Sequence, residues 1–497
     1  MTEEDREIEL KLELENGAAA ALRAHPALAG LKAKSADQSS TYYDTPDSAL
    51  RKAGYSLRVR QAKGRHIQTV KHQTSGAAGL FDRPEWETDI PGPEPDLRAA
   101  AKTPLGEVLT KKLRKQLTPL IRSDMVRTTW LAELDGSTIE VVLDEGDVAG
   151  GDAREVIAEL ELELKAGAPS ALIGFARELT RSVPARLGVL TKAERGYRLA
   201  DGSAARATKG ERITLDRGMS TAAGFAAICY SCMRQFRLNE PLVIAAREPA
   251  ALHQARVAMR RLRSAFSLFR PVIAGDEVFA ALREEVRWFT NQLGDARNMD
   301  VLLKRVGGRS EELRALLEGE RERAYAQVLD ALASARLRGM MLDLVAWIET
   351  GPWRQAKRAR EPLEDFASDQ LDKRWRKVKK GGRALAELEP EARHQLRIEV
   401  KKLRYAIEFL AALQAGEAAA RQKGFAAEVE EMQEQLGHLN DAETARDLLE
   451  GLLGGRPDRE KLLDAAGGGR AGPSEAETVE AATRAFARLV EIGRFWR

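Results

Sequence analysis

The sequence predicts an α+β chain of two domains, an antiparallel β domain followed by an all-α domain. Three observations lead to this prediction. Charged and apolar residues alternate with a period of two along much of residues 6–197, which is typical of strands with one apolar face. Beyond residue 217, Ala, Leu, Glu and Arg dominate with helical spacing. A basic motif in this second half occurs twice, which indicates an internal repeat of a helical bundle.

The amino-acid composition argues against two classes of protein, those that stack single-stranded bases and those that disulfides stabilise. The chain has 497 residues, with 79 Lys and Arg against 76 Asp and Glu, so its net charge is only +3. A strong electrostatic field can therefore arise only where charges of one sign cluster locally. Aromatic residues are only 5%, which argues against surfaces that stack single-stranded bases. Cys229 and Cys232 are the only cysteines, so no disulfide framework is expected, and we interpret them as ordinary helix cysteines.

The hydropathy pattern favours neither a membrane-spanning segment nor a secretory signal. No run of about 18 uncharged apolar residues occurs. The acidic, alternating start of the sequence is unlike a secretory signal. We therefore expect a soluble, cytoplasmic protein that does not contact the membrane.

The first domain begins with the clearest strand, in which Glu7, Glu9, Lys11 and Glu13 alternate with Ile and Leu. Similar alternation predicts further strands at residues 56–60, 66–73, 85–90, 126–133, 138–144 and 156–165, and helices are predicted at 18–31, 105–116 and 170–182. Many strands with few helices favour a sandwich or a closed barrel. Alternation alone leaves open whether the charged faces line a tunnel or contact solvent.

The charges on these strands are sorted by sign. Glu7 and Glu9 share a strand face with Lys11, and acidic residues recur at Glu140, Asp144, Glu159, Glu161 and Glu163. Crowded carboxylates repel unless they are protonated, paired or bridged by cations, and Mg²⁺ or Mn²⁺ would suit such oxygen ligands. Other strands are predicted to bear cations suited to phosphate oxygens: Arg58, Arg60, Lys71, Arg127 and Lys192. Together these groups favour phosphoryl transfer, and the alternative for any one of them is a solvated strand surface.

An ordered set of motifs over about residues 5–200 resembles the CYTH domain of the triphosphate tunnel metalloenzymes. The motifs are Glu7-Ile8-Glu9-Leu10-Lys11, Tyr42-Tyr43-Asp44-Thr45-Pro46, Leu57-Arg58-Val59-Arg60, Thr69-Val70-Lys71, Glu85-Trp86-Glu87, Val142-Leu143-Asp144, Glu159-Leu160-Glu161-Leu162-Glu163 and Lys192-Ala193-Glu194-Arg195-Gly196-Tyr197. The resemblance implies an eight-stranded antiparallel tunnel with its charges inside, which binds a triphosphate end-on with two divalent ions, Mg²⁺ or Mn²⁺.

The resemblance also implies a role for each matched residue. Metal would be held by Glu7, Glu9, Asp144, Glu159 and Glu161, although the register among Glu159, Glu161 and Glu163 stays open. Substrate would be bound by Lys11, Arg58, Arg60, Lys71, Arg127 and Lys192. Glu7, Glu9, Lys11 and Lys192 would form the catalytic set, and Glu85 and Glu87 could support the basic residues.

The second half is predicted to be helical, with examples at residues 279–293, 310–337, 425–436 and 475–492. It contains two basic stripes, in which His and three cations recur at i, i+3, i+7 and i+10. They are His253, Arg256, Arg260 and Arg263, with Arg261 beside them, and His394, Arg397, Lys401 and Arg404, with Lys402 beside them. Such stripes fit nucleic acid, anionic lipid or polyphosphate, or are paired with acids on neighbouring helices. No helix-turn-helix or interleaved aromatic residues favour the reading of bases.

Both stripes lie in segments that resemble the CHAD domain, over about residues 217–497. The resemblance implies two pseudo-symmetric four-helix bundles that bind inorganic polyphosphate through the residues of both stripes. We therefore predict a tunnel domain at 1–200, a linker at 201–216 and a helical domain at 217–497, and we expect the first to hydrolyse triphosphate without the second.

The function expected from the sequence is a metal-dependent inorganic triphosphatase, which converts tripolyphosphate to pyrophosphate and phosphate, with a polyphosphate-binding domain. Two alternatives stay open. One is a non-catalytic polyphosphate-binding scaffold, and the other is an enzyme acting on an organic triphosphate, either an adenylyl cyclase or a thiamine triphosphatase. We expect a cytoplasmic location associated with polyphosphate granules, and no specific nucleic-acid partner.

Overall fold

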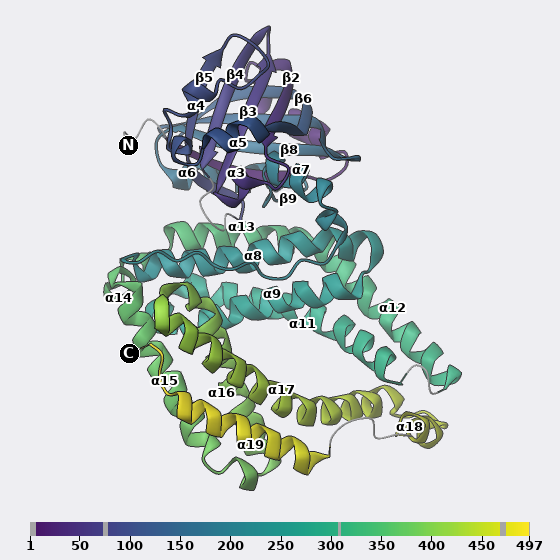
Figure 1. The fold of residues 1–497 in the computed structure, drawn as a ribbon. Helices are drawn as coiled ribbons and strands as arrows, with labels where there is room; N and C mark the ends of the chain where they lie inside the picture. Colours follow the sequence, from purple (N-terminus) through teal and green to yellow (C-terminus); the bar gives the residue numbers. More distant parts are fainter. Residues whose placement is uncertain (1–5, 73–77, 307–309, 468–473, 497) are drawn as a thin grey trace. The chain divides into compact units, whose positions relative to one another are not determined.

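The computed structural model describes residues 6–72, 78–306, 310–467 and 474–496 (Figure 1). The chain forms two compact units. One, the β unit, comprises the chain up to residue 209 together with residues 233–246 and 333–351. The other, the helical unit, comprises residues 210–232, 247–332 and 352–497.

The β unit is built on an eight-stranded antiparallel barrel. The eight barrel strands are β1 (Arg6–Leu14), β2 (Lys34–Asp44), β3 (Tyr55–Ala62), β4 (Arg65–His72), β5 (Leu80–Ile90), β6 (Thr118–Leu134), β7 (Ser137–Gly150) and β8 (Ala153–Ala166). A ninth, short strand, β9 (Ala185–Leu187), pairs with β1. Their order is β5-β4-β3-β2-β6-β7-β8-β1-β9, and the pairing of β1 with β5 closes the barrel. Residues 6–10 of β1 pair with β5, whereas residues 12–14 pair with the short strand β9. The predicted tunnel fold is confirmed.

Short turns with left-handed backbone connect several of these strands. Asp135 and Gly136 between β6 and β7 have φ of 47° and 75°, and Lys63 and Gly64 between β3 and β4 have φ of 51° and 76°. Two successive positive φ angles are the signature of a type I′ turn, whose twist matches that of the flanking strands. These turns hold the long β6–β7 pair and the β3–β4 pair in register.

The apolar faces of the strands point out of the barrel and the charged faces point in. Leu10, Leu12, Leu160 and Leu162 are fully buried, and they alternate with the charged residues of β1 and β8. Helix α6 (Pro169–Thr180) packs on β1 and β8 and covers this apolar surface. The question that alternation left open is therefore answered, since the charges lie inside.

Short helices complete the β unit: α1 (Ala18–Arg23), α2 (Pro26–Ala29), α3 (Ala49–Lys52), α4 (Leu97–Ala100), η2 (Pro104–Glu107), α5 (Lys111–Gln116), α7 (Lys192–Ala200) and η3 (Ser203–Ala205). The helix predicted at 18–31 is divided at His25 and Pro26, because proline lacks the N–H that an uninterrupted helix would need. Strand β2 was not predicted, because most of its residues are polar on both faces.

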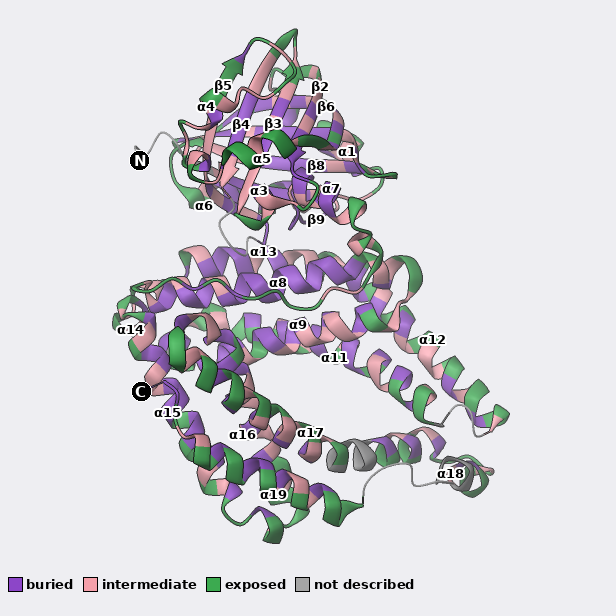
Figure 2. Cartoon of the chain, in the orientation of Figure 1, coloured by how far each residue is buried: buried purple, intermediate pink, exposed green. Residues whose placement is uncertain are grey.

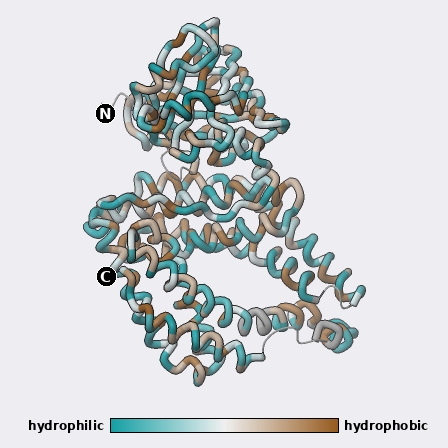
Figure 3. The backbone as a smooth tube through the Cα atoms, viewed as in Figure 1, coloured by the Kyte–Doolittle hydropathy of each residue, from teal (hydrophilic) through white to brown (hydrophobic). Residues whose placement is uncertain are grey.

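The helical elements of the rest of the chain are α8 (Thr221–Ala246), α9 (Pro249–Leu268), α10 (Arg270–Ile273), α11 (Glu277–Val306), α12 (Glu311–Ala333), α13 (Ala335–Thr350), η4 (Pro352–Gln355), α14 (Lys357–Arg360), α15 (Leu363–Gly382), η5 (Leu385–Glu387), α16 (Pro390–Phe409), η6 (Ala411–Leu413), α17 (Gly416–Leu453), α18 (Arg459–Gly467) and α19 (Glu475–Ile492). The helix predicted at 310–337 is two helices, because Ser334 has extended backbone and caps α13 with its hydroxyl. Buried and exposed residues alternate along these helices, as does hydropathy (Figures 2 and 3).

Within the helical unit, the two helices that contain the basic stripes pack against each other. Helix α9 contacts α11 and α16, and α16 contacts α15 and α17. The two stripes therefore belong to adjacent helices, in keeping with the expected repeat. No helix in the described part of the chain is both long enough and apolar enough to cross a bilayer.

Candidate functional site

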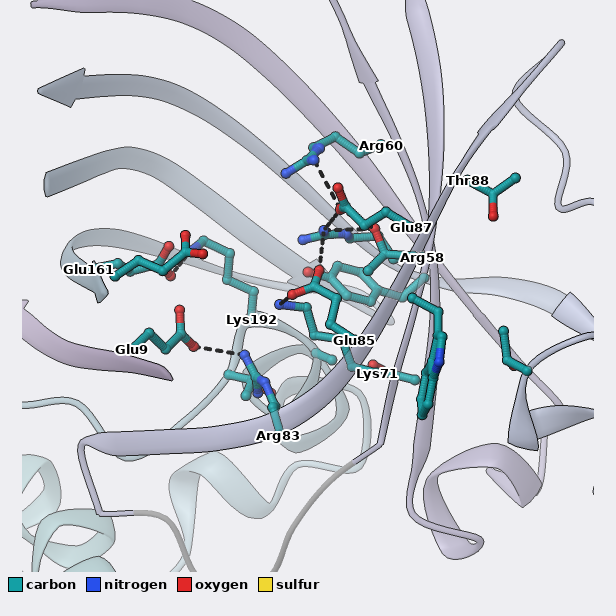
Figure 4. A pocket seen from close by; sticks show the side chains of 18 of the residues that line it. Glu9, Arg58, Arg60, Lys71, Arg83, Glu85, Glu87, Thr88, Glu161 and Lys192 are labelled. Carbon is teal, nitrogen blue, oxygen red and sulfur yellow. Dashed lines mark hydrogen bonds and ion pairs between the residues drawn. The ribbon is translucent and has the colours of Figure 1, made fainter. Parts of the chain in front are cut away.

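The barrel encloses a charged cavity of about 720 Å³. Among the described residues, nine Lys or Arg and six Glu side chains line it: Lys11, Arg58, Arg60, Lys71, Arg83, Lys102, Arg127, Lys165, Lys192, Glu9, Glu85, Glu87, Glu140, Glu161 and Glu163. Figure 4 shows many of these side chains converging from several strands on one space. Such a lining suits a ligand with many negative charges.

Strand register brings the acidic rows of β1, β7 and β8 together. Lys11 lies opposite Glu161, and Glu13 lies opposite Glu159, in the β1–β8 pair. Asp144 lies opposite Glu159 in the β7–β8 pair. Because like charges directly opposite each other repel, this part of the barrel requires cations from elsewhere.

Lys192 supplies one of these cations. Its Nζ lies 2.9 Å from Asp144 Oδ2, 2.8 Å from Glu159 Oε2 and 2.9 Å from Glu161 Oε1. The residue was predicted on a strand, but it is the first residue of helix α7. Thr191 and Glu194 form a capping box there, which starts the helix and fixes its first turn, including Lys192.

Lys11 and Arg127 complete the same cluster. Lys11 forms an ion pair with Glu161 and lies 3.6 Å from Glu159. Arg127 donates from Nε to Asp144 Oδ1 at 2.8 Å and from Nη2 to Glu161 at 3.1 Å. Three predicted substrate-binding cations and three predicted metal-binding carboxylates thus form one buried network.

Burial and charge act in opposite directions on this network. Burial raises the pKa of Glu161, but Lys11, Lys192 and Arg127 outweigh burial and hold it well below its usual value. Burial lowers the pKa of Lys192, but Asp144, Glu159 and Glu161 outweigh burial and hold it well above its usual value. The network is therefore fully ionised at neutral pH.

A second cluster of cations lies on β3 and β4 and faces Glu85 and Glu87 of β5 (Figure 4). Lys71 Nζ lies 2.8 Å from Glu85, and Arg60 Nη2 lies 3.2 Å from Glu87. Arg58 donates to Thr69 at 2.9 Å and lies 3.5 Å from Glu87. All three predicted cations line the cavity, and Glu85 and Glu87 support them.

Carboxylate oxygens are ligands that a hard divalent ion prefers, but the described carboxylates are not arranged as a metal site. Glu9 and Glu161 line the cavity, whereas Asp144 and Glu159 are fully buried and do not line it. Each of the four is held by Lys or Arg, and no three described Asp, Glu, His or Cys side chains are arranged as a metal site. The side chain of Glu7 lies outside the described part of the structure.

Two arginines of this site were not predicted. Arg83 on β5 donates to Glu9 Oε1 at 2.7 Å, and it shares a strand face with Glu85 and Glu87, a period-two signal that could have identified it. Arg195 donates to Glu13 at 2.9 Å, to Glu155 at 2.6 Å and to Glu159 at 3.4 Å. Its spacing of three from Lys192 places both on one face of α7.

The basic stripes of the helical unit meet at Tyr405. Arg260 donates from Nε to Tyr405 Oη at 2.7 Å, and the Arg404 guanidinium lies 4.4 Å from the centre of the Tyr405 ring. Arg263 and His394 are exposed, and the other stripe residues are half-buried: His253, Arg256, Arg260, Arg397, Lys401 and Arg404. Of the residues beside the stripes, Lys402 is half-buried and pairs with Glu399 at 2.6 Å. Arg261 is 2% exposed and donates to Glu408 at 2.7 Å, so the structure places it in the interior rather than on the predicted binding surface.

A second cavity in the helical unit, of about 800 Å³, contains Lys402, the residue beside the second stripe, in its lining. It is lined by Ser267, Arg270, Pro271, Ala274, Gln370, Lys373, Arg374, Arg376, Lys377 and Lys402, without an acidic residue among them. Arg374 is 8% exposed, and its Nε has no hydrogen-bond partner among the described residues. Sequence analysis missed this cavity, although the run of cations over residues 373–380 was a signal.

The two cysteines of α8 lie in the helical unit and are buried and unbridged. Burial raises the pKa of the Cys232 thiol to about 12 and that of Cys229 well above its usual value. Both are therefore protonated at neutral pH, as expected of ordinary helix cysteines.

Comparison with known proteins finds two families in this chain. The family model described as the CYTH domain matches residues 5–197, and the one described as the CHAD domain matches residues 227–450. A protein from Haemophilus influenzae named inorganic triphosphatase is 33% identical over 162 residues, which are 32% of this chain and 45% of that protein. The chain thus spans less than half the length of this curated relative.

Solved structures give weaker likenesses. A crystal structure of the CHAD domain from the plant Ricinus communis is 28% identical with a TM-score of 0.49, covering 56% of this chain and 96% of that chain. A putative adenylyl cyclase from Hippeastrum, described as revealing a dominant triphosphatase activity, is 18% identical with a TM-score of 0.28, covering 39% of this chain and 96% of that chain.

Proposed function

The chain belongs to the CYTH family through residues 5–197 and to the CHAD family through residues 227–450, and from this premise we propose that it is a metal-dependent inorganic triphosphatase with a polyphosphate-binding helical domain. The observation that supports the enzyme is the barrel cavity, whose lining contains nine Lys or Arg and six Glu side chains among the described residues. The Haemophilus influenzae relative, which is named an inorganic triphosphatase, supports the choice of substrate.

The proposed reaction is attack of water on the terminal phosphorus of tripolyphosphate. The P–O bond of the anhydride breaks, orthophosphate is released and pyrophosphate remains. Lys11, Arg127 and Lys192 would bind phosphate oxygens at the carboxylate end, and Arg58, Arg60 and Lys71 would bind them at the other end. Divalent ions held by Glu9, Asp144, Glu159 and Glu161 would neutralise phosphate charge and lower the pKa of water.

A phosphate-release assay tests the enzyme and its alternatives. Tripolyphosphate, ATP and thiamine triphosphate are each supplied with Mg²⁺ or Mn²⁺, and cyclic AMP is measured alongside. We expect the largest kcat/KM with tripolyphosphate, no cyclic AMP, and no turnover after chelation of the metal. Cyclic AMP from ATP would favour the cyclase instead, and binding of tripolyphosphate without release of phosphate would favour the scaffold.

The proposed second function, polyphosphate binding, is supported by the stripes and by the basic cavity beside them. A linear polyanion can follow cations spaced by about one helical turn, and the buried Arg374 has a donor that no described residue satisfies. Binding should weaken as salt rises, because phosphate contacts by Lys and Arg release condensed counterions.

Charge reversal of one residue in each stripe tests this second function. Arg260→Glu combined with Lys401→Glu should reduce affinity for long polyphosphate about 100-fold or more in 0.1 M salt, whereas Lys423→Glu, an exposed cation of α17, should change it by about 2-fold at most. Unchanged affinity in the double reversal, or equal affinity for duplex DNA at the same salt, would contradict the proposal.

A further inference from the structure

We propose that Arg234 and Arg237 of helix α8 are positioning residues of the tunnel site, holding the strand and the helix that present its charged groups. This inference rests on the proposed triphosphatase function. Residues 233–246 of α8 belong to the β unit, although they lie beyond both the predicted tunnel domain and the segment matched to its family. Nothing in the sequence pattern of α8 distinguishes these two arginines from the others of the helical half.

Arg237 is buried against the end of the barrel. It is 4% exposed, its Nε donates to the carbonyl oxygen of Leu187 in β9 at 2.7 Å, and its Nη2 donates to Glu13 Oε2 at 2.8 Å. It also forms an ion pair with Glu240, one turn further along α8. One guanidinium thereby fixes the two strands β1 and β9 relative to each other.

Glu13 relays this contact to the acidic end of the cavity. Its second oxygen, Oε1, accepts a hydrogen bond from Arg195 Nη2 at 2.9 Å, and the same nitrogen lies 3.4 Å from Glu159 Oε1. Glu159 in turn lies 2.8 Å from Lys192. Arg195 therefore holds two carboxylates that face each other across the β1–β8 pair, and Arg237 neutralises the outer one.

Removal of Arg237 would change how the Arg195 guanidinium divides its hydrogen bonds between Glu13 and Glu159. Glu13 would keep a single arginine and draw Arg195 toward itself, and Glu159 would lose part of its neutralising charge. An uncompensated charge in a buried network is costly, so the side chains rearrange. The consequence falls on Glu159 and Lys192, which lie at the proposed reaction centre.

Arg234, one turn earlier in α8, acts on the helix that presents Lys192. Its Nη2 donates to Glu194 Oε1 at 2.7 Å, and its Nη1 donates to the carbonyl oxygen of Val189. The other oxygen of Glu194 accepts the backbone N–H of Thr191 at 2.8 Å, which closes the capping box of α7. The first turn of α7, with Lys192 in it, is therefore anchored to α8.

The test compares three single variants of the full chain: Arg234→Gln, Arg237→Gln and, as a matched control, Arg338→Gln. Arg338 of α13 belongs to the same unit and pairs at 3.3 Å with Glu15, just beyond β1. Glu15 pairs with Arg186, whose other acidic partner is Glu240, and none of these residues lines the cavity. Measured quantities are kcat and KM for tripolyphosphate, thermal unfolding, and hydrogen exchange of residues 192–200.

We expect Arg234→Gln and Arg237→Gln to lower kcat about 10- to 100-fold, as a small misplacement of catalytic groups does. KM should change by about 3-fold at most, because Arg58, Arg60 and Lys71 are untouched. Exchange of α7 should rise in both variants but not in Arg338→Gln. Arg237→Lys, which retains the charge facing Glu13 but offers one nitrogen instead of three, should recover part of kcat.

Two results would overturn the inference: kcat within about 2-fold of wild type in both variants with unchanged exchange of α7, or an equal loss of kcat in Arg338→Gln. A wild-type protein that releases no phosphate from tripolyphosphate with either metal would refute the proposed function instead. In that case the exchange of α7, compared between Arg234→Gln and Arg338→Gln, still decides whether α8 positions the site.

Discussion

At the scale of single residues, the side a strand residue faces decides its role, and Asp144 and Glu145 of β7 show this. They are neighbours in sequence. Asp144 is fully buried between Arg127 and Lys192, whereas Glu145 lies on the other face and pairs with the exposed Arg23. The two carboxylates therefore provide a matched pair for mutation.

We expect Asp144→Asn to lower kcat for tripolyphosphate about 100-fold. The change removes a negative charge that neutralises Arg127 and Lys192 and would also neutralise the proposed metal ion. Glu145→Gln should stay within about 2-fold of wild type, because surface pairs contribute little. Phosphate release and thermal unfolding of both variants check this. Equal activity of the two variants would contradict the place of Asp144 in the site.

His253 is a second residue whose surroundings set its chemistry. Burial lowers its pKa, and repulsion by Arg297, Arg260 and Arg256 adds to this effect, so that the pKa is about 4. The histidine is therefore neutral at pH 7. A bound polyanion would offset the three arginines and raise this pKa.

From this shift we predict that polyphosphate binding takes up a proton. Because the pKa is higher in the complex than in the free protein, affinity should rise as pH falls from 7 toward 4. Two-dimensional NMR of the imidazole should show a midpoint of about 4 in the free protein and a higher one with polyphosphate. His253→Gln should remove this part of the pH dependence, and an unmoved midpoint would contradict the prediction.

At the scale of elements, the strands that could be predicted are those in which charged and apolar residues alternate regularly. β1 and β8 were predictable because charged residues alternate with Leu or Ile along residues 7–14 and 159–164. β2 was not, because Ser, Thr and Gln occupy both of its faces, and α7 was hidden because only nine residues form it. The family resemblance located Lys11 and Arg127 in the sequence, but their pairing with Glu161 depends on strand register.

The same argument explains which site residues escaped prediction. Arg237 and Glu13 are 224 residues apart, and no periodicity connects them. Arg195 lies in one of the motifs that resemble the CYTH domain, yet its contact with Glu159 depends on how α7 packs on the barrel. Contacts set by tertiary packing of separate elements leave no local trace in one sequence.

The capping box of α7 gives a prediction at this scale. Thr191→Ala removes the hydroxyl that accepts the Glu194 N–H, which costs about 1 kcal/mol of stability. Because Lys192 is the next residue, kcat for tripolyphosphate should fall as well. Ser474→Ala breaks the capping box of α19, with a similar cost in stability but unchanged kcat. Equal kcat in the two variants would show that the cap serves stability alone.

At the scale of the whole molecule, the compact unit around the barrel is larger than the domain predicted at 1–200. It includes residues 233–246 and 333–351, which follow the predicted linker. Arg234 and Arg237 lie in the first of these segments and contact Glu194 and Glu13. The expectation that residues 1–200 hydrolyse triphosphate without the helical domain stays a prediction, and because such a fragment lacks both arginines, we expect a lower kcat from it.

We predict that a fragment of residues 1–200 folds as a β-barrel but hydrolyses tripolyphosphate with a kcat about 10- to 100-fold below that of the full chain. The full chain with Arg234→Gln and Arg237→Gln combined should lose a similar factor, because both changes remove the same contacts to Glu13 and Glu194. Circular dichroism establishes the fold of the fragment, and phosphate release gives kcat. A fragment as active as the full chain would mean that the barrel holds α7 and β1 in place by itself. A fragment far less active than the double variant would mean that residues 333–351 contribute as well.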